Sequence, residues 1–168
     1  LSQASCGFVD LVVAIHFIPF VSDLGWSELF AAAVLGASGV FAVLGSILSG
    51  WMSDRVGPKA ALFTLHALRI VSLPMLIAFG MTGSVLWLYA FAPLYGATSI
   101  MGFSATSVMV RRMFGPRALG AVVGNLQLNH HLGSAVGAWA AGAIFDAFGS
   151  YYPAFVVATL IAATGAFG

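Results

Sequence analysis

Two ionisable side chains lie deep inside apolar stretches of this sequence. Arg69 is near the middle of an apolar run at 61–79, and Asp10 lies mid-way along another at 2–21. In a hydrocarbon environment a charge is costly, so it normally faces the protein interior or a water-filled path, where it is paired or functional. We therefore consider two roles for Arg69: contact with a substrate, or structural pairing with Asp10 or a helix carbonyl.

A second group of polar side chains lies within the apolar run at 119–144. At 100° per residue, a helix places Gln127, His130, His131 and Ser134 within an arc of roughly 100°. Such a stripe could line a cavity, where a histidine could bind an anion when protonated or relay a proton, because its pKa lies near neutrality. Hydrogen bonding between helices is the alternative and the commoner use of such residues.

Other chemistry finds little support in the residue pattern. His130 and His131 point about 100° apart on a helix and have no Asp or Glu within a turn, so we expect no metal site. The single cysteine, Cys6, excludes an internal disulfide and a cysteine-based cluster. His16 and His66 are each expected to reach an interface or a backbone carbonyl. We predict no catalytic residues and no cofactor.

Composition identifies the solvent around these side chains. Of the 168 residues, 61% are hydrophobic and 7% are charged, against about 45–50% apolar and 25% charged in soluble domains. Lipid is the solvent that suits this composition, which predicts an integral membrane protein. The net charge of +1 indicates no nucleic-acid partner.

Apolar runs long enough to cross a bilayer are separated by breaks at 22–29, 51–60, 80–84, 110–118 and 145–150. Continuous apolar runs favour helices over the alternating strands of a barrel. The chain opens with Leu1 and its last apolar run is short, so we expect a piece of a longer protein. The predicted fold is an all-α membrane protein with six transmembrane helices at about 2–21, 30–50, 61–79, 85–109, 119–144 and 151–168.

The cations predict an orientation. Five of the six Lys and Arg residues lie in or beside the second and fourth breaks, which places those breaks in the cytoplasm. The N-terminus is then cytoplasmic, and the expected location is the plasma (inner) membrane. Small residues add a packing prediction, because glycine pairs spaced four apart let helix backbones approach closely; the pairs are Gly120 with Gly124 and Gly133 with Gly137.

The second break carries a motif. Residues 50–59 match G-x-x-x-D-R-x-G-x-[RK] and resemble the signature loop of the major facilitator superfamily. A compact loop needs Gly57 to turn, and Asp54 can cap or pair with a neighbouring helix end. Arg55 and Lys59 would hold the cytoplasmic side, and Gly50 opens the motif.

Three further stretches, 16–25, 114–117 and 142–151, resemble the C-terminal half of monocarboxylate transporters and oxalate/formate antiporters. The resemblance implies that residues 1–168 are a single six-helix half-domain, one half of a 12-helix bundle whose N-terminal half is the missing partner. Two positions depart from the pattern. Pro58 stands where a basic residue is usual, and Ser46 stands where the anion-carrying branch commonly has an arginine that helps to hold the substrate carboxylate.

The resemblance implies a secondary active transporter of a small organic solute, with a monocarboxylate as one candidate and protons as a candidate coupling ion. Arg69, Asp10, Gln127, His130 and His131 are the candidate pathway residues. A major facilitator carrier or efflux protein with a non-carboxylate substrate is the alternative. An intramembrane enzyme or a non-transporting scaffold is the alternative of another class.

Overall fold

The computed structural model describes residues 1–167, which fold entirely into helices joined by short turns. The α-helices are α1 (Ser2–Asp23), α2 (Glu28–Arg55), α3 (Pro58–Thr82), α4 (Leu86–Thr98), α5 (Met101–Phe114), α6 (Leu119–Phe148) and α7 (Tyr152–Ala166), and a 3₁₀ turn covers Pro116–Ala118. With α4 and α5 taken as one broken span, this is the predicted all-α arrangement of six spans. Three helices, α1, α2 and α3, are long and apolar enough to cross a membrane by themselves.

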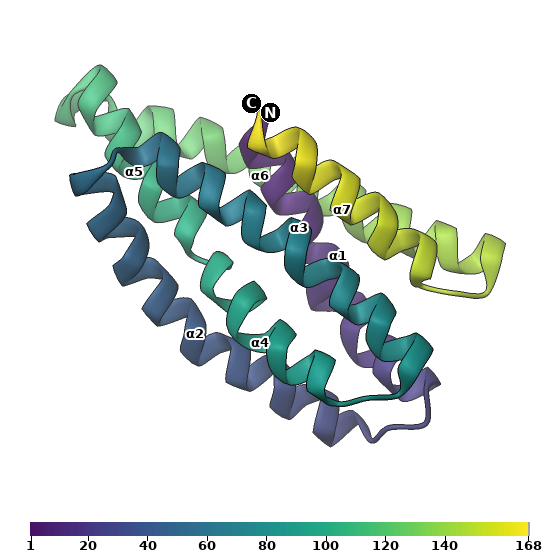
Figure 1. The fold of residues 1–168 in the computed structure, drawn as a ribbon. Coiled ribbons are helices and arrows are strands. Elements are labelled where there is room, and N and C mark those ends of the chain that lie inside the picture. Colours follow the sequence, from purple (N-terminus) through teal and green to yellow (C-terminus); the bar gives the residue numbers. More distant parts are fainter. Residues whose placement is uncertain (168) are drawn as a thin grey trace.

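Successive spans run in opposite directions, so the two ends of the described chain lie together at one end of the bundle (Figure 1). Helix α1 packs mainly along α6 and α7, while α3 packs along α4 and α7, and α2 along α4. The breaks that carry the cations lie at the same end as the chain ends, because each follows an even number of spans. This arrangement agrees with the predicted alternation of sides.

The fourth span is not the continuous helix that we predicted at 85–109. It is divided at Ser99 and Ile100 into α4 and α5. The amide of Ser99 donates to the carbonyl of Gly96, three residues back, at 3.1 Å, and the Thr98 hydroxyl donates to the carbonyl of Tyr95 at 2.7 Å. These bonds tighten the last turn of α4 and end it.

The signature segment is also more helical than predicted. The expected break at 51–60 shrinks to Val56 and Gly57, because α2 continues through Arg55 and α3 begins at Pro58. Nothing in residues 51–55 disfavours a helix, whereas Gly57 has a φ of 114°, which only glycine adopts readily. Proline at the first position of α3 has no N–H to leave unpaired.

An aromatic and aliphatic core holds α1, α3, α4 and α7 together. Phe17 of α1 stacks on Phe91 of α4 with ring centroids 5.6 Å apart, and Phe20 meets Phe155 of α7 edge-on at 4.9 Å. Phe17, Phe91 and Phe155 are fully buried. Helices α1, α3 and α4 also carry the polar side chains described below. The core therefore fixes the positions of those polar side chains.

One of the two glycine pairs acts as predicted. A Cβ atom on Gly133 or Gly137 of α6 would overlap the backbone of Ala4 or Phe8 of α1, so these glycines permit the close approach of the two helices. For Gly120 and Gly124 the prediction is wrong within residues 1–167, because a Cβ there would meet no atom within 4 Å.

Candidate functional site

Within residues 1–167, the most deeply buried charge is the guanidinium of Arg69, whose side chain has no solvent exposure. Its Nη2 atom lies 2.5 Å from Oδ1 of Asp10, so α3 and α1 are joined by an ion pair. Both residues lie well inside their helices, where neither side chain can reach a helix end. The structure therefore contains the pairing that we considered as one of the two roles of Arg69.

The other two nitrogens of the guanidinium also donate hydrogen bonds. Nη1 donates to the carbonyl of Cys6 at 2.8 Å, and Nε donates to the hydroxyl of Thr98 at 3.0 Å. The Tyr95 ring lies beneath the guanidinium, with its centroid 5.8 Å from Cζ. A buried cation is tolerated only when its donors are paired in this way, because desolvation alone costs several kcal/mol.

Asp10 is the centre of the cluster and its more accessible member. Oδ1 accepts a second hydrogen bond from the Tyr95 hydroxyl at 3.3 Å, and Oδ2 accepts one from the Cys6 thiol at 3.6 Å. His130 of α6 brings Nε2 to 3.6 Å from Oδ2. The side chains of Asp10 and His130 are 22% and 18% exposed, whereas Arg69 is fully buried, so an arriving solute would meet Asp10 and His130 first.

The predicted polar stripe on α6 is divided between the protein interior and the surface. Ser134 is buried and donates to the carbonyl of Gly7 at 3.0 Å, which is the interhelical bonding considered above. His130 is half-buried and its Nδ1 has no partner among the described residues. Gln127 is half-buried, and His131 is exposed and stacks on His130 with ring centroids 5.5 Å apart. Pathway roles for these residues stay predictions.

The two remaining histidines have local partners. His16 places Nε2 at 3.1 Å from the carbonyl of Ala138, as one of its expected roles required. His66 is fully buried, which was not expected, and its Nε2 lies 2.9 Å from the Ser2 hydroxyl. Ser2 is the first residue of α1, and the His66 ring occupies the space that a side chain at Gly165 of α7 would need. Both histidines therefore connect helices.

The signature segment lies at the end of the bundle that holds the chain ends. Asp54 contacts the guanidinium of Arg112 in α5 at 3.6 Å, with the two side chains 77% and 48% exposed. Arg55 and Lys59 are exposed, and Gly50 and Gly57 are half-buried. An exposed pair of this kind contributes at most about 1 kcal/mol to stability. Asp54 thus pairs with a neighbouring helix end, as the motif predicted.

Sequence reasoning missed the residues that complete the cluster. Tyr95 and Thr98 belong to the fourth span and lie three residues apart, so they share one helix face. That spacing of two polar side chains within an apolar run could have identified them. The participation of the Cys6 backbone carbonyl has no sequence signal. A hydrogen bond from Gln3 to Thr106, which joins α1 to α5, was also not foreseen.

Within residues 1–167, no group of three or more His, Cys, Asp or Glu side chains is arranged to hold a metal ion. The arrangement instead offers a carboxylate with one cation already bound to it and a histidine beside it. Such a group can exchange protons and can rearrange its charge pairs when an ionic solute arrives.

An all-helical membrane domain with a paired charge cluster between its spans is the kind of structure from which membrane transporters are built. Residues 2–167 match the family described as the Major Facilitator Superfamily, and the chain belongs to that family. The family comprises transporters and not enzymes, as the signature segment predicted.

Three curated relatives are similar to the chain. An MFS-type transporter of Bacillus subtilis (strain 168), named YcxA and described as uncharacterized, is 26% identical over 145 residues, which cover 84% of this chain and 35% of the relative. Monocarboxylate transporter 13 of Rattus norvegicus is 31% identical over 147 residues (86% and 33%), and that of Bos taurus is 31% identical over 149 residues (86% and 34%). The chain thus spans about a third of the length of these relatives.

Proposed function

We propose that residues 1–168 form a six-helix half-domain, the C-terminal half of a 12-helix secondary active transporter for a small organic solute. Membership in the Major Facilitator Superfamily and the six-span topology support this proposal. The proposed mechanism is alternating access, in which two halves rock about a site near the middle of the membrane. With five of six cations at one end of the bundle, the proposed orientation has the N-terminus in the cytoplasm and the plasma (inner) membrane as the location.

The buried cluster of Asp10, Arg69 and His130 is the observation that carries the proposal of a transport site. It lies between four spans, and only its Asp10 and His130 edge is exposed. A charged cluster in a membrane domain is costly, and three functions of the cluster would justify that cost: binding a solute, carrying a proton, or joining helices. We assign the first two to this cluster in addition to the third, which its hydrogen bonds display.

A proton-coupled cycle follows from the charges. With Asp10 ionised, Arg69 is neutralised and an anionic solute gains little from approaching. Protonation of Asp10 removes the counterion of Arg69, whose charge then attracts the carboxylate of a solute entering beside His130. One proton and one carboxylate would enter together, and release of the proton to the other side would restore the ion pair and expel the solute.

A monocarboxylate is the proposed substrate class. Its support is the resemblance to the monocarboxylate branch and the names of two relatives, both monocarboxylate transporter 13. One observation favours a second candidate, a non-carboxylate solute: Ser46 in α2 provides no cation where the anion-carrying branch commonly has an arginine. Arg69 is the cation in the bundle interior that could replace it, and it must first leave Asp10.

Transport by the full-length parent protein in sealed vesicles tests this proposal. Uptake of radiolabelled lactate, formate and oxalate is measured with and without an inward proton gradient. We expect lactate or formate uptake that the gradient accelerates, and a protonophore, which collapses the gradient, should abolish that acceleration. Uptake of a non-carboxylate solute alone would support the second candidate, and absence of uptake for every solute tried by correctly inserted protein would contradict the transporter proposal.

A further inference from the structure

Two apolar grooves meet at Lys59, at the end of the bundle that holds the cations. The first has a volume of about 270 Å³ and is lined by Leu62, Phe63, Met109 and the last turn of α7. The second, about 320 Å³, is lined by Val56, Met113 and the first residues of α3. Lys59 and Met109 belong to both grooves, so the two grooves adjoin at these side chains.

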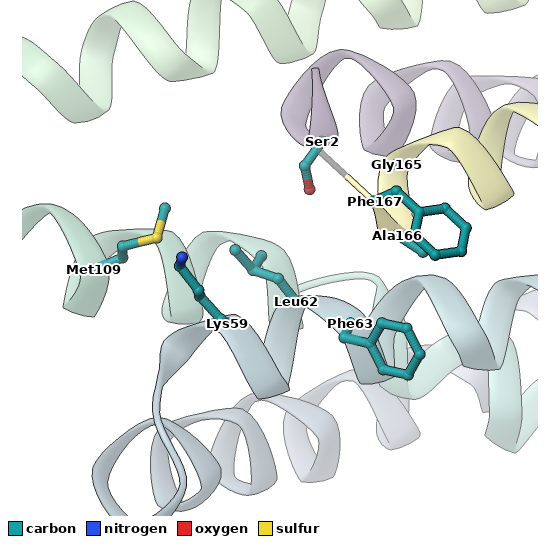
Figure 2. Close-up of a pocket in the computed structure, with 8 residues that line it drawn as sticks. All are labelled: Ser2, Lys59, Leu62, Phe63, Met109, Gly165, Ala166 and Phe167. Atoms are coloured by element: carbon teal, nitrogen blue, oxygen red, sulfur yellow. The ribbon is translucent and has the colours of Figure 1, made fainter.

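Figure 2 shows Lys59 extending from the first turn of α3 toward the pocket, with Met109 on one side of its nitrogen and Leu62 on the other. Phe63 and Phe167 lie along the wall farther from the lysine. Ser2 also lines the pocket, so the pocket has a charged end at Lys59, one hydroxyl, and otherwise apolar side chains. This is the shape and polarity that an amphiphile with an anionic head and a hydrocarbon tail requires.

The positive charge at Lys59 is available. No acidic side chain lies within 4.0 Å of its ammonium group in the described part of the chain. Arg112 lines the second groove and shares its charge with Asp54 across an exposed contact of 3.6 Å. The start of α3 adds few donors to this groove, because Pro58 has no N–H and the amide of Ala60 donates to the carbonyl of Gly57 at 3.1 Å.

Apolar side chains along the two grooves are exposed in this part of the protein. Phe63, Val56 and Met113 are exposed large hydrophobic side chains at 54%, 68% and 68%. In a membrane domain hydrocarbon chains cover such side chains, and a basic pocket between helices at the cytoplasmic side suits an anionic headgroup. A lipid whose phosphate lies at Lys59, and whose acyl chain follows the Leu62 and Phe63 groove, satisfies both the charge and the apolar wall.

We infer that the two grooves form a binding site for an anionic phospholipid, with Lys59 as the principal headgroup contact. Arg112 supports the phosphate, and Met109 and Phe63 contact the acyl chain. The site lies apart from the Asp10 cluster, and the inference is independent of the solute carried.

Native mass spectrometry of the full-length protein tests the inference, with phosphatidylglycerol and phosphatidylcholine of equal chain length as probes in detergent micelles. For Lys59→Gln we expect phosphatidylglycerol affinity to fall about five-fold, the effect of one basic contact near a membrane surface. Phosphatidylcholine affinity should stay unchanged, and Lys59→Arg should retain phosphatidylglycerol.

Arg117→Gln is the matched control, because Arg117 carries the same charge at the same end of the bundle but lines neither groove. An equal loss of phosphatidylglycerol affinity in both variants would mean general attraction to a basic surface and would overturn the site. Unchanged phosphatidylglycerol affinity in Lys59→Gln would also overturn it, because Lys59 would then make no contact with the headgroup. Because Lys59 is exposed, the variant should fold normally, which its thermal unfolding temperature checks.

Discussion

Arg69 and Asp10 are 59 residues apart in the chain, yet their side chains meet at 2.5 Å inside the bundle. The contact joins the third span to the first, and Thr98 and Tyr95 attach the fourth span to the same pair. His130 adds the fifth span at 3.6 Å from Asp10. One carboxylate and one guanidinium therefore connect four spans. The pair holds these helices together and is also the candidate transport site.

The ion pair should show strong energetic coupling. We expect Arg69→Met and Asp10→Ala each to lower the free energy of unfolding by about 3–5 kcal/mol, because each leaves one buried charge without its partner. The double variant should lose much less than the sum of the two single losses. Equilibrium unfolding of the full-length protein in mixed micelles measures all three values.

Arg111→Met is a suitable control for this cycle, because Arg111 is exposed in α5 and forms no ion pair within residues 1–167. Its effect should stay within about 0.5 kcal/mol. Additive losses in the double variant would show that Arg69 and Asp10 do not depend on each other.

Asp10→Asn should uncouple transport from protons. In the proposed cycle, acidification outside raises carboxylate uptake because it protonates Asp10 and frees Arg69. An asparagine carries no charge at any pH, so Arg69 is always without its counterion and uptake should lose its acceleration by an inward proton gradient. Initial rates of lactate uptake at several external pH values measure this loss.

Asp146→Asn provides the comparison for that experiment, since Asp146 is an exposed carboxylate near the far end of α6. Its uptake should keep the acceleration. If Asp10→Asn kept it as well, another group would have to carry the proton and Asp10 would have a structural role only.

The α1 and α6 contact should not tolerate a side chain at Gly137. A methyl group there would overlap the backbone of Phe8, which cannot rotate away, so Gly137→Ala should destabilise the protein by about 1–3 kcal/mol. Gly124→Ala on the same helix meets no described atom within 4 Å and should gain up to about 1 kcal/mol from helix propensity. Thermal unfolding of the two variants should therefore shift in opposite directions. A loss in Gly124→Ala as large as that in Gly137→Ala would refute this account of the contact.

The turn between α2 and α3 should depend on Gly57. Its φ of 114° lies in a region that other residues adopt only with strain, so Gly57→Ala should cost about 1–3 kcal/mol of stability. Gly36→Ala, at a helical position of α2 with no neighbour within 4 Å, should be neutral or slightly stabilising. Equal unfolding temperatures for the two variants would show that the turn relaxes without cost.

The sequence by itself determined the class and the rough topology of this protein. Hydropathy is a property of local segments, and a span in lipid must satisfy its backbone hydrogen bonds within its own helix. Composition and the spacing of breaks therefore predict six helical spans. The motif at 50–59 predicted the family for the same reason, because it is contiguous in the chain. Helix ends were less predictable. Residues 51–55 include three polar side chains and were predicted as a break, yet α2 continues through Arg55 and α3 begins at Pro58.

Only the tertiary structure decided which contacts the polar residues make. The sequence placed Asp10 and Arg69 at similar depths and left open whether they meet, because depth does not determine the rotation of a helix about its axis. That rotation buries Arg69 completely, turns Ser134 and His130 toward α1, and leaves His131 at the surface. It also brings Tyr95 and Thr98 into the cluster. Thr98 is the last residue of α4, directly before the break at Ser99. Contacts between distant spans depend on packing, and packing is decided by all the helices together.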